Sequence, residues 1–299
     1  SSDLSFVAEY AMDIELFDYD LPGELVAQYP MQRRDESRLT VLDRRDGSTC
    51  VRRFADVIEY VKPGDAVVVN NTKVFKARLW GQRRTGGRVE VFLVRPLDDG
   101  RELQWLALVS PSRRVKEGED IVFDDDRVRL IGYLGDGQWR IGFNSRTQRE
   151  RVINRHGHVP LPHYIRREDT PSDIRRYQTV FADSAKVGAV AAPTAGFHFT
   201  RRILDQLRGK GIEIVELTLH VGPGTFKPVK TDRIEDHSVD PEFAELSAEA
   251  ARRINVVRAR GGDVFAVGTT SVRTLESAEI VDGEVQPLAR MVDLYIRPG

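Results

Sequence analysis

The pattern of apolar and polar positions changes along this chain. In residues 21–30, LPGELVAQYP, prolines bound a short apolar stretch, which predicts a short helix. Residues 37–54 alternate apolar and polar positions around an Asp-Gly pair, and this predicts a β-hairpin. Residues 54–65 predict a second short helix that ends at a Pro-Gly pair.

Between residues 66 and 143 the apolar positions recur at every second residue. The runs include AVVVN, RVEVFLVRPL and LQWLALVS, and pairs of Gly-Gly and Asp-Gly separate them. Five or six short strands at such spacing predict a small antiparallel β-barrel.

After residue 178 helical and strand-like segments alternate. Residues 203–211, 247–262 and 269–280 predict helices, and Ser247 is the expected N-cap of the second. Residues 212–221 and 263–268 predict strands. This order of strands and helices predicts an α/β layer, so we expect one α/β part and one barrel.

The composition narrows the classes of protein that fit. The 299 residues are enough for two domains, and 45 basic against 46 acidic residues give a formal net charge of −1, so global charge does not indicate nucleic-acid binding. One cysteine excludes an internal disulfide and argues against a thiolate metal site. No apolar run is long enough to span a bilayer and no signal peptide is evident, so we expect a cytoplasmic protein without a metal.

One segment has an excess of basic residues, unlike the chain as a whole. Residues 144–177 hold eight arginines against four acidic residues, a local charge of +4. Together with Tyr164 and Tyr177, such a segment is typical of a surface that holds RNA phosphates and stacks a base. A solvated connector with surface charge is the other interpretation.

Three junctions between predicted elements carry the candidate chemistry: residues 191–200 (AAPTAGFHFT), 217–229 (LTLHVGPGTFKPV) and 264–277 (VFAVGTTSVRTLES). In α/β layers, ligands favour the carboxyl ends of strands. The amides and hydroxyls at the start of the helix that follows residue 268 suit a carboxylate or a phosphate, although plain helix capping explains them equally well.

Histidines at two of these junctions suit general acid or base work, because their side chains titrate near neutral pH. They are His198 and His220. The structural alternatives stay open: a packed, hydrogen-bonded His220, and an N-cap at Thr200 with Phe197 and Phe199 in the core. The chain has no HExxH, CxxC or GxSxG motif, no Walker loop and no dinucleotide fingerprint.

Several longer stretches of the sequence, taken together, resemble those of one protein family. They include FDYDLPGELVAQYP, RDESRLTVLDR, PGDAVVVNNTKVFKARLWG, GHVPLPHYIRRED, GAVAAPTAGFHFT, LTLHVGPGTFKPV and VFAVGTTSVRTLES, and they run from Phe17 almost to the end of the chain. In these phrases the chain resembles the S-adenosylmethionine:tRNA ribosyltransferase-isomerase family of queuosine biosynthesis.

The resemblance implies a fold and a reaction. The fold is an α/β main domain, a mixed sheet with flanking helices, that carries an inserted antiparallel β-barrel. The reaction moves and isomerises the ribosyl part of S-adenosylmethionine onto 7-aminomethyl-7-deazaguanine at the wobble position of a tRNA. Epoxyqueuosine, adenine and methionine are the implied products. S-adenosylmethionine serves as a substrate, with no further cofactor, and we expect a monomer that does not bind membranes.

The resemblance and the junctions together give candidate residues. The catalytic candidates are His198, His220 and His237. The candidates for binding S-adenosylmethionine are Pro193, Thr194, Gly196, Phe197, Gly222, Gly224, Thr225, Gly268, Thr269, Thr270 and Arg273, of which Thr269, Thr270 and Arg273 are expected at the methionine carboxylate. The candidates for contacting tRNA are Tyr164, Arg166, Arg167, Arg175, Arg176 and Tyr177.

The expected domains follow the change of period. Residues 13–65 and 156–299 form the α/β catalytic domain, residues 66–155 form the inserted barrel, and residues 1–12 are an extension or a remnant of cloning.

Two phrases depart from the family pattern. Asn70 to Lys73 read NNTK where the family has Asn-Asp-Thr-Arg, and Asp240 stands where a second histidine is expected. These changes support one alternative, a degenerate relative that binds tRNA without turnover. A further alternative is an enzyme of the same fold that uses S-adenosylmethionine on a small molecule.

Overall fold

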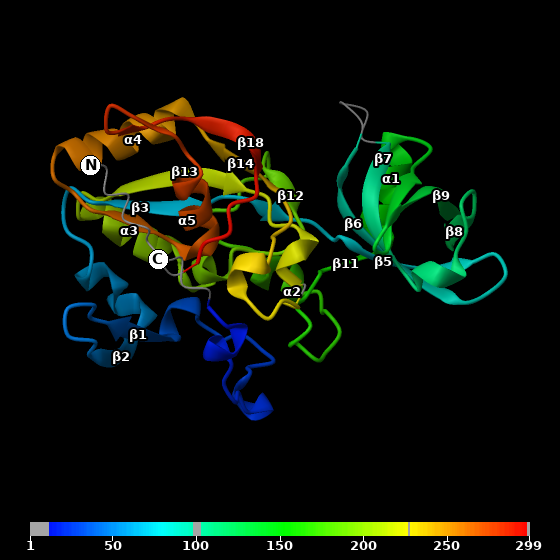
Figure 1. Cartoon of the computed structure of the whole chain (residues 1–299), viewed down its shortest axis with the longest axis horizontal. Helices are drawn as coiled ribbons and strands as arrows, with labels where there is room; N and C mark the ends of the chain where they lie inside the picture. Colours follow the sequence, from blue (N-terminus) through cyan, green and yellow to red (C-terminus); the bar gives the residue numbers. More distant parts are fainter. Residues whose placement is uncertain (1–11, 98–102, 227, 298–299) are drawn as a thin grey trace, which may run out of the picture.

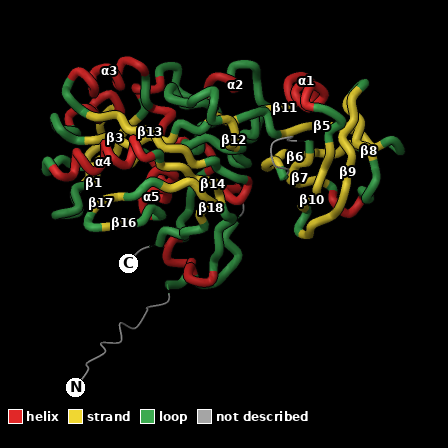
Figure 2. Tube along the Cα trace, turned by 90° about the horizontal axis from the view of Figure 1, so that it is seen from above, coloured by secondary structure: helices red, strands yellow, loops and turns green. Residues whose placement is uncertain are grey.

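The structure is a computed structural model that describes residues 12–97, 103–226 and 228–297. It consists of a mixed β-sheet with helices on both faces and a closed antiparallel β-barrel beside it (Figure 1). In the view from above the barrel is a separate lobe (Figure 2). The structure confirms the predicted fold class.

The mixed sheet has the strand order β15–β3–β13–β14–β18. The strands β15, β3 and β13 are parallel, and β14 and β18 are antiparallel to their neighbours. The bounds are Val264–Ala266 (β15), Ala66–Asn70 (β3), Glu213–Leu219 (β13), Glu242–Leu246 (β14) and Leu288–Val292 (β18). The helices of this part are α3 (Arg201–Gly209), α4 (Ala248–Ala259) and α5 (Gly268–Glu276).

The strand β3 lies inside this sheet, whereas the period of the sequence placed residues 66–70 in the barrel. All five residues are buried. Val67 and Val69 pack in the cluster that contains α3, and Ala66 and Val68 pack in the cluster that contains α4. A parallel strand covered on both faces has no polar side, so its continuous apolar run does not distinguish it from a barrel strand.

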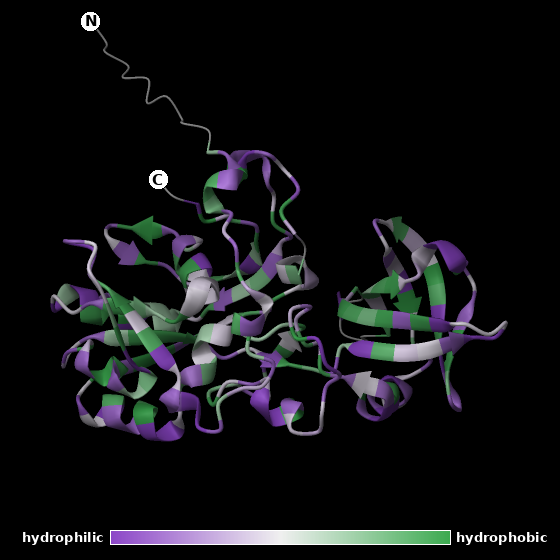
Figure 3. Cartoon of the chain, turned by 90° about the horizontal axis from the view of Figure 1, so that it is seen from below, coloured by the Kyte–Doolittle hydropathy of each residue, from purple (hydrophilic) through white to green (hydrophobic). Residues whose placement is uncertain are grey.

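The barrel closes through six strands in the order β5–β6–β7–β10–β9–β8, with β8 pairing back onto β5. Their bounds are Arg78–Arg83 (β5), Arg88–Pro96 (β6), Gln104–Ser110 (β7), Asp120–Phe123 (β8), Asp126–Gly135 (β9) and Gln138–Gly142 (β10). Buried and more exposed residues alternate along β7 and β10, and the barrel strands carry both hydrophobic and hydrophilic bands (Figure 3). Gly81 allows the close packing, because a Cβ there would lie 2.6 Å from Ile121 Cγ2.

The barrel is inserted between two short parallel strands, β4 (Lys73–Val74) and β12 (Val187–Ala189). After the barrel, helix α1 (Arg146–His156) and strand β11 (Gly157–His158) lead back to the sheet. The pattern did not predict α1. Its first residues are held by Ser145, whose hydroxyl accepts from the backbone of Gln148 at 3.1 Å, and Val152 is buried against the barrel.

The segment before the sheet has less helix than predicted. The hairpin forms as β1 (Arg38–Leu42) and β2 (Thr49–Arg53), but residues 21–30 contain only the 3-10 turn Gly23–Leu25, and residues 54–65 only the 3-10 helix Phe54–Glu59. The Gln28 carbonyl accepts a hydrogen bond from Arg167, and the carbonyls of Met31 and Gln32, just after residues 21–30, accept from Arg176. Tertiary contacts therefore hold this segment in a largely non-helical conformation.

The three predicted helices after residue 200 form, and the first two have side-chain caps at the expected residues. Thr200 accepts from Ile203 N at 3.2 Å at the start of α3, and Ser247 accepts from Ala250 N at 3.1 Å at the start of α4. The remaining short elements are η1 (Ile14–Phe17), η3 (Arg34–Glu36), η5 (Ser112–Arg114), α2 (Asp173–Arg176), η6 (Thr194–His198), η7 (Pro223–Phe226), η8 (Ile234–Asp236), β16 (Ile280–Val281) and β17 (Glu284–Val285). None of the helices within the described ranges is both long and apolar enough to cross a membrane.

Candidate functional site

The three junctions that carried the candidate chemistry meet along one segment, residues 187–198. Gly188 lies against the ring of His220, where a Cβ would be 2.7 Å from Cδ2. Val190 N donates to Val221 O at 2.9 Å. At the other end, a Cβ on Gly268 at the start of α5 would lie 3.1 Å from Cβ of Ala195. Segments far apart in the sequence thus form one continuous wall.

This wall borders two cavities. The first, which we call the interdomain cleft, has a volume of about 490 Å³ and lies between the barrel and the mixed sheet. The barrel contributes Val94, Arg95, Pro96, Leu106, Leu108 and Gln138, and the rest contributes Val187, Gly188, His220, Gly222, Pro223, Asp240, Pro241, Glu242, Phe243 and Met291.

His220 is held firmly at the cleft. Its Nδ1 shares a hydrogen bond of 2.7 Å with Thr72 Oγ1, and its ring stacks on Phe243 with 5.9 Å between ring centres. Nε2 has no hydrogen-bond partner among the described residues. Burial, with a smaller contribution from the positive charge of Lys186, lowers the pKa of His220 below its usual value, so the ring is neutral at neutral pH.

The loop after β3 positions Thr72. The Asn70 side chain accepts from Thr72 N at 3.1 Å and from Leu219 N at 3.0 Å, and it donates to Leu219 O at 2.9 Å. These bonds tie the end of β3 to the residue that precedes His220. The sequence analysis did not single out Thr72, although the phrase NNTK contains it.

The departures in that phrase lie behind the cleft. Asn71 donates to Glu216 Oε2 at 3.2 Å and accepts from Thr218 Oγ1 at 2.7 Å. An aspartate at this position would place a second carboxylate beside Glu216, so asparagine fits its surroundings here. Within the described residues, neither Asn71 nor Lys73 lines either of the two cavities. These two positions therefore give no support to a chain that binds tRNA without turnover.

A buried ion pair forms the floor of the cleft. Glu242 accepts from Gly222 N at 2.7 Å and from Arg273 Nη1 at 2.6 Å, and Arg273 also donates to the carbonyls of Asp240 and Val292. Burial raises the pKa of Glu242, and the bonds from Gly222 and Arg273 oppose that rise. Arg273, a candidate for the methionine carboxylate, is thus engaged by a carboxylate of the protein itself.

The hydroxyls at the start of α5 do not cap the helix. The residue at the N-cap position, Val267, makes no side-chain capping bond. Ser271 donates back to Val267 O at 2.9 Å, and Thr274 donates to Thr270 O at 3.0 Å. Thr270 Oγ1 and Arg273 Nε are buried without a hydrogen-bond partner in the structure. Buried polar atoms of this kind call for an explanation, and a bound ligand is one.

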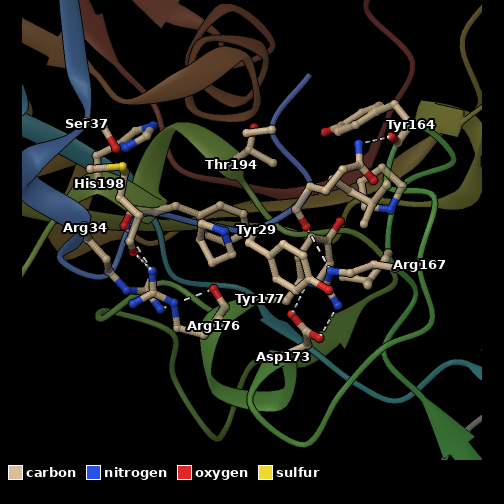
Figure 4. Close-up of a pocket in the computed structure, with 18 residues that line it drawn as sticks. Tyr29, Arg34, Ser37, Tyr164, Arg167, Asp173, Arg176, Tyr177, Thr194 and His198 are labelled. Atoms are coloured by element: carbon tan, nitrogen blue, oxygen red, sulfur yellow. Dashed lines mark hydrogen bonds and ion pairs between the residues drawn. The ribbon is translucent and has the colours of Figure 1, made fainter. Parts of the chain in front are cut away.

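The second cavity, which we call the aromatic pocket, has a volume of about 320 Å³ (Figure 4). His198, Ser37 and Arg34 lie at one end, and Tyr164 and Arg167 at the other (Figure 4). The complete lining is Ala27, Gln28, Tyr29, Pro30, Met31, Arg34, Ser37, Leu161, Pro162, Tyr164, Ile165, Arg167, Asp173, Arg176, Tyr177, Thr194, Phe197 and His198.

Arginines connect the walls of the aromatic pocket. Arg34 donates to Phe197 O at 3.1 Å and to the carbonyls of Arg175 and Arg176, and Arg176 donates to the carbonyls of Met31 and Gln32. Arg167 forms a bidentate pair with Asp173 at 2.7 and 2.9 Å. This pair lowers the pKa of Asp173 to about 2.

The three candidate catalytic histidines do not share a cavity. His198 lines the aromatic pocket, where burial lowers its pKa and the ring of Phe54 lies 5.2 Å away. His220 lines the interdomain cleft. His237 packs edge-to-face on Tyr295 with 5.2 Å between ring centres and lines neither cavity.

The other candidates for S-adenosylmethionine divide in the same way. Thr194 and Phe197 line the aromatic pocket, and Gly222 lines the cleft. Pro193 and Gly196 are buried beside the aromatic pocket, and Gly224 lies close to Asp240, where a Cβ would be 2.8 Å from Oδ2. Thr225 belongs to the turn η7, and Thr269 is exposed at the start of α5.

The candidates for tRNA gather at the aromatic pocket. Tyr164, Arg167, Arg176 and Tyr177 line it, and Arg166 lines an adjoining hollow. The side chain of Tyr177 is only 7% exposed, and burial raises its pKa. Tyr177 therefore forms a wall of the pocket. Residues 144–177 are also less charged than their composition indicates, because Arg151 pairs with Asp126, which lies outside this segment.

Several residues of the two cavities were missed by the sequence analysis. Tyr29 and Arg34 lie in phrases that carried the resemblance, but they have no local motif. Asp173 is a short-range partner of Arg167, a spacing that the local charge pattern alone does not distinguish from surface charge. Within the described residues, no three histidine, cysteine, aspartate or glutamate side chains are grouped to hold a metal ion.

Comparisons with known proteins cover almost the whole chain. Residues 14–299 match the model of a family described as queuosine biosynthesis protein. A relative from Syntrophotalea carbinolica, an S-adenosylmethionine:tRNA ribosyltransferase-isomerase, is 46% identical over 289 residues, which are 96% of this chain and 83% of that protein. A relative of the same name from Trichlorobacter lovleyi is 42% identical with the same coverage. A solved structure of S-adenosylmethionine tRNA ribosyltransferase from Thermotoga maritima is 33% identical, covers 94% of this chain and 79% of its own, and has a TM-score of 0.45.

Proposed function

Because this chain belongs to the S-adenosylmethionine:tRNA ribosyltransferase-isomerase family of queuosine biosynthesis, we propose that it transfers and isomerises the ribosyl part of S-adenosylmethionine onto a modified tRNA base. The acceptor is 7-aminomethyl-7-deazaguanine at the wobble position. The products are epoxyqueuosine in the tRNA, adenine and methionine. The observation that carries the proposal is the match over 96% of the chain, which includes both the barrel and the mixed sheet.

The interdomain cleft is our proposed site for the reacting centre. The positive sulfur of S-adenosylmethionine makes the neighbouring ribose carbon acidic, and a neutral base must remove its proton. His220 has the properties of this base: a lowered pKa, a fixed ring and a free Nε2 at the cleft. His198, in the neighbouring cavity, remains a candidate for the acid that assists the departure of adenine, and His237 a third candidate.

Asp240 supplies negative charge at the cleft. Its carboxylate would stabilise a sulfonium by Coulombic attraction, whereas Glu242 is already paired with Arg273 and Arg95 also lines the cleft. Phe243 and Met291 supply apolar and polarisable surface for the methyl and methylene groups. The negative charge thus comes from the residue that replaces the histidine expected from the resemblance.

The start of α5 is our proposed contact for the methionine carboxylate. Thr269 and Thr270 lie in its first turn, where helix amides favour an anion. Thr270 Oγ1 and Arg273 Nε are the buried polar atoms that a carboxylate would satisfy there. Arg273 also orients this end of the site through its pair with Glu242.

The experiment measures adenine released from S-adenosylmethionine, with and without a tRNA that carries 7-aminomethyl-7-deazaguanine, followed by mass spectrometry of the modified nucleoside. The proposal expects adenine only with the modified tRNA and the mass gain of an epoxycyclopentane group on the base. Adenine release that needs only a free deazapurine would replace tRNA with a small-molecule acceptor. Binding of tRNA without any adenine would reject turnover by this chain.

A further inference from the structure

Two tyrosines at the rim of the aromatic pocket are unusually exposed for large aromatic side chains. Tyr29 is 69% exposed and Tyr164 is 56% exposed. One face of the Tyr29 ring is covered by Arg167, whose guanidinium carbon lies 4.5 Å from the ring centre. Since most of the ring is still accessible to solvent, its other face is open for stacking.

Hydrogen bonds hold the segments that carry these two rings in place before a ligand binds. Asp173 and the carbonyl of Gln28 fix the guanidinium that lies under Tyr29. The Gln28 side chain donates to Tyr164 O at 3.0 Å and accepts from Arg166 N at 2.6 Å. Residues 26–32, which we call the strap and which include Tyr29, are thereby tied to the segment that carries Tyr164. A rigid aromatic surface loses little entropy when a ligand stacks on it.

The same pocket holds positive charge that no acidic side chain balances. Arg34 and Arg176 lie side by side (Figure 4), and their hydrogen bonds go to backbone carbonyls. In the part of the chain that the structure describes, neither guanidinium pairs with a carboxylate. Two such charges beside an aromatic surface favour a ligand that combines a flat ring with an anion.

We propose that the aromatic pocket binds one unpaired base of the RNA substrate, with the base stacked on Tyr29 and an adjacent phosphate on Arg34 and Arg176. The inference that the ligand is RNA rests on the proposed function. The pocket, at about 320 Å³, is near the lower end of ligand sites and suits a group the size of a nucleoside. The larger cleft, with its carboxylates, is left for S-adenosylmethionine. The RNA would therefore touch the enzyme at two points: the reacting base at the cleft and a second base in the pocket.

The first test compares binding by variants of exposed tyrosines. Tyr29→Ala removes the stacking surface, Tyr29→Phe keeps it, and Tyr19→Ala is the matched control because Tyr19 is 73% exposed and lines neither cavity. The probe is an unmodified RNA stem-loop with the anticodon, and S-adenosylmethionine is titrated separately. We expect Tyr29→Ala to weaken RNA binding about tenfold or more, with binding of S-adenosylmethionine unchanged and both other variants close to wild type.

The second test identifies the base. Each loop position of the stem-loop is replaced in turn by an abasic nucleotide. At one position the loss of the base should weaken binding to the wild type by the factor seen for Tyr29→Ala and should have no further effect on that variant, because both changes remove one contact. In addition, Arg176→Gln should make the dependence of binding on salt shallower by about one phosphate contact.

Three results would overturn the proposal. Weaker binding of S-adenosylmethionine in Tyr29→Ala, with RNA binding intact, would mean that the pocket holds the adenosyl group. Unchanged RNA binding would mean that nothing stacks on Tyr29. Effects that add at every abasic position would mean that the RNA touches this surface through its backbone. Adenine release by the wild type is measured in parallel with the tRNA that carries 7-aminomethyl-7-deazaguanine. If the stem-loop binding obeys the second test and this modified tRNA gives no adenine, the proposed function is rejected and the base site stands.

Discussion

The interdomain cleft and the aromatic pocket share one wall and differ in charge. Each is lined by a histidine whose pKa burial lowers, His220 in the cleft and His198 in the pocket. The cleft has the carboxylates of Asp240 and Glu242, whereas the pocket has guanidinium groups held by backbone carbonyls. Two cavities of one fold can thus differ in the charged groups that they present, and our proposals assign the sulfonium to the cleft and the RNA phosphates to the pocket.

We expect the largest effect from replacing the histidine that lines each cavity. His220→Gln should lower kcat by about 10²- to 10⁴-fold, since it removes the proposed base, and should leave the affinity for tRNA unchanged. Because His198 lines the aromatic pocket, we expect His198→Gln to lower tRNA affinity, and a loss of kcat as well would identify His198 as the acid that assists the departure of adenine. Adenine release in single turnovers and filter binding of tRNA give the two quantities. An equal loss of kcat in both variants would place both histidines at the reacting centre.

A substitution beside His220 tests the role of this histidine without replacing a titratable residue. In Gly188→Ala the new Cβ would lie 2.7 Å from the ring of His220 and displace it. A displacement of about 1 Å at a reacting group costs about 10²-fold in rate, and we expect a loss of this order in kcat. Gly209→Ala is the control, because a Cβ on Gly209 meets no atom within 4 Å. If both variants kept wild-type kcat, His220 would not be the base.

Loss of the hydrogen bond between Thr72 and Nδ1 of His220 should have a smaller effect. Thr72→Val keeps the shape of the side chain and removes the bond to Nδ1 of His220, so we expect kcat to fall about tenfold. Thr72→Ser should retain most of the activity. Because His220 must be neutral to accept a proton and its pKa is lowered, wild-type activity should rise with pH and level off below the usual pKa of histidine, near 6.5. A pH profile that is identical in Thr72→Val and wild type would show that Thr72 supports only the fold.

The smallest effect concerns the stability of the pocket. The pKa of Asp173 is lowered from 3.8 in the unfolded chain to about 2, so its contribution to folding is present above pH 3.8 and is lost as pH falls through 2. Asp173→Asn should lower the free energy of unfolding by about 1–2 kcal/mol at neutral pH, with the difference from wild type shrinking below pH 3.8. Urea unfolding at several pH values measures this. A difference that stays constant down to pH 2 would mean that the Arg167 pair does not stabilise the fold.

Much of the architecture was predictable from local patterns. Alternation with a period of two predicted the barrel, and the caps Thr200 and Ser247 begin α3 and α4 as their side chains require. The strand β3 was misplaced because burial on both faces removes the alternation on which the assignment depends. The helix expected over residues 21–30 is reduced to the 3-10 turn Gly23–Leu25, and tertiary hydrogen bonds, such as the one from Arg167 to the Gln28 carbonyl, hold the segment.

The sequence by itself determined the family, the fold class and the chemical types at the three junctions, because these depend on residue identity and on spacing within short segments. Only the tertiary structure decided which side chains share a cavity. It separated His198 from His220, engaged Arg273 with Glu242, and placed Thr72 behind His220. The physical reason is that these contacts join residues far apart along the chain, and packing of the sheet, the strap and the barrel sets their distances. Local propensity and period contain no information on such distances.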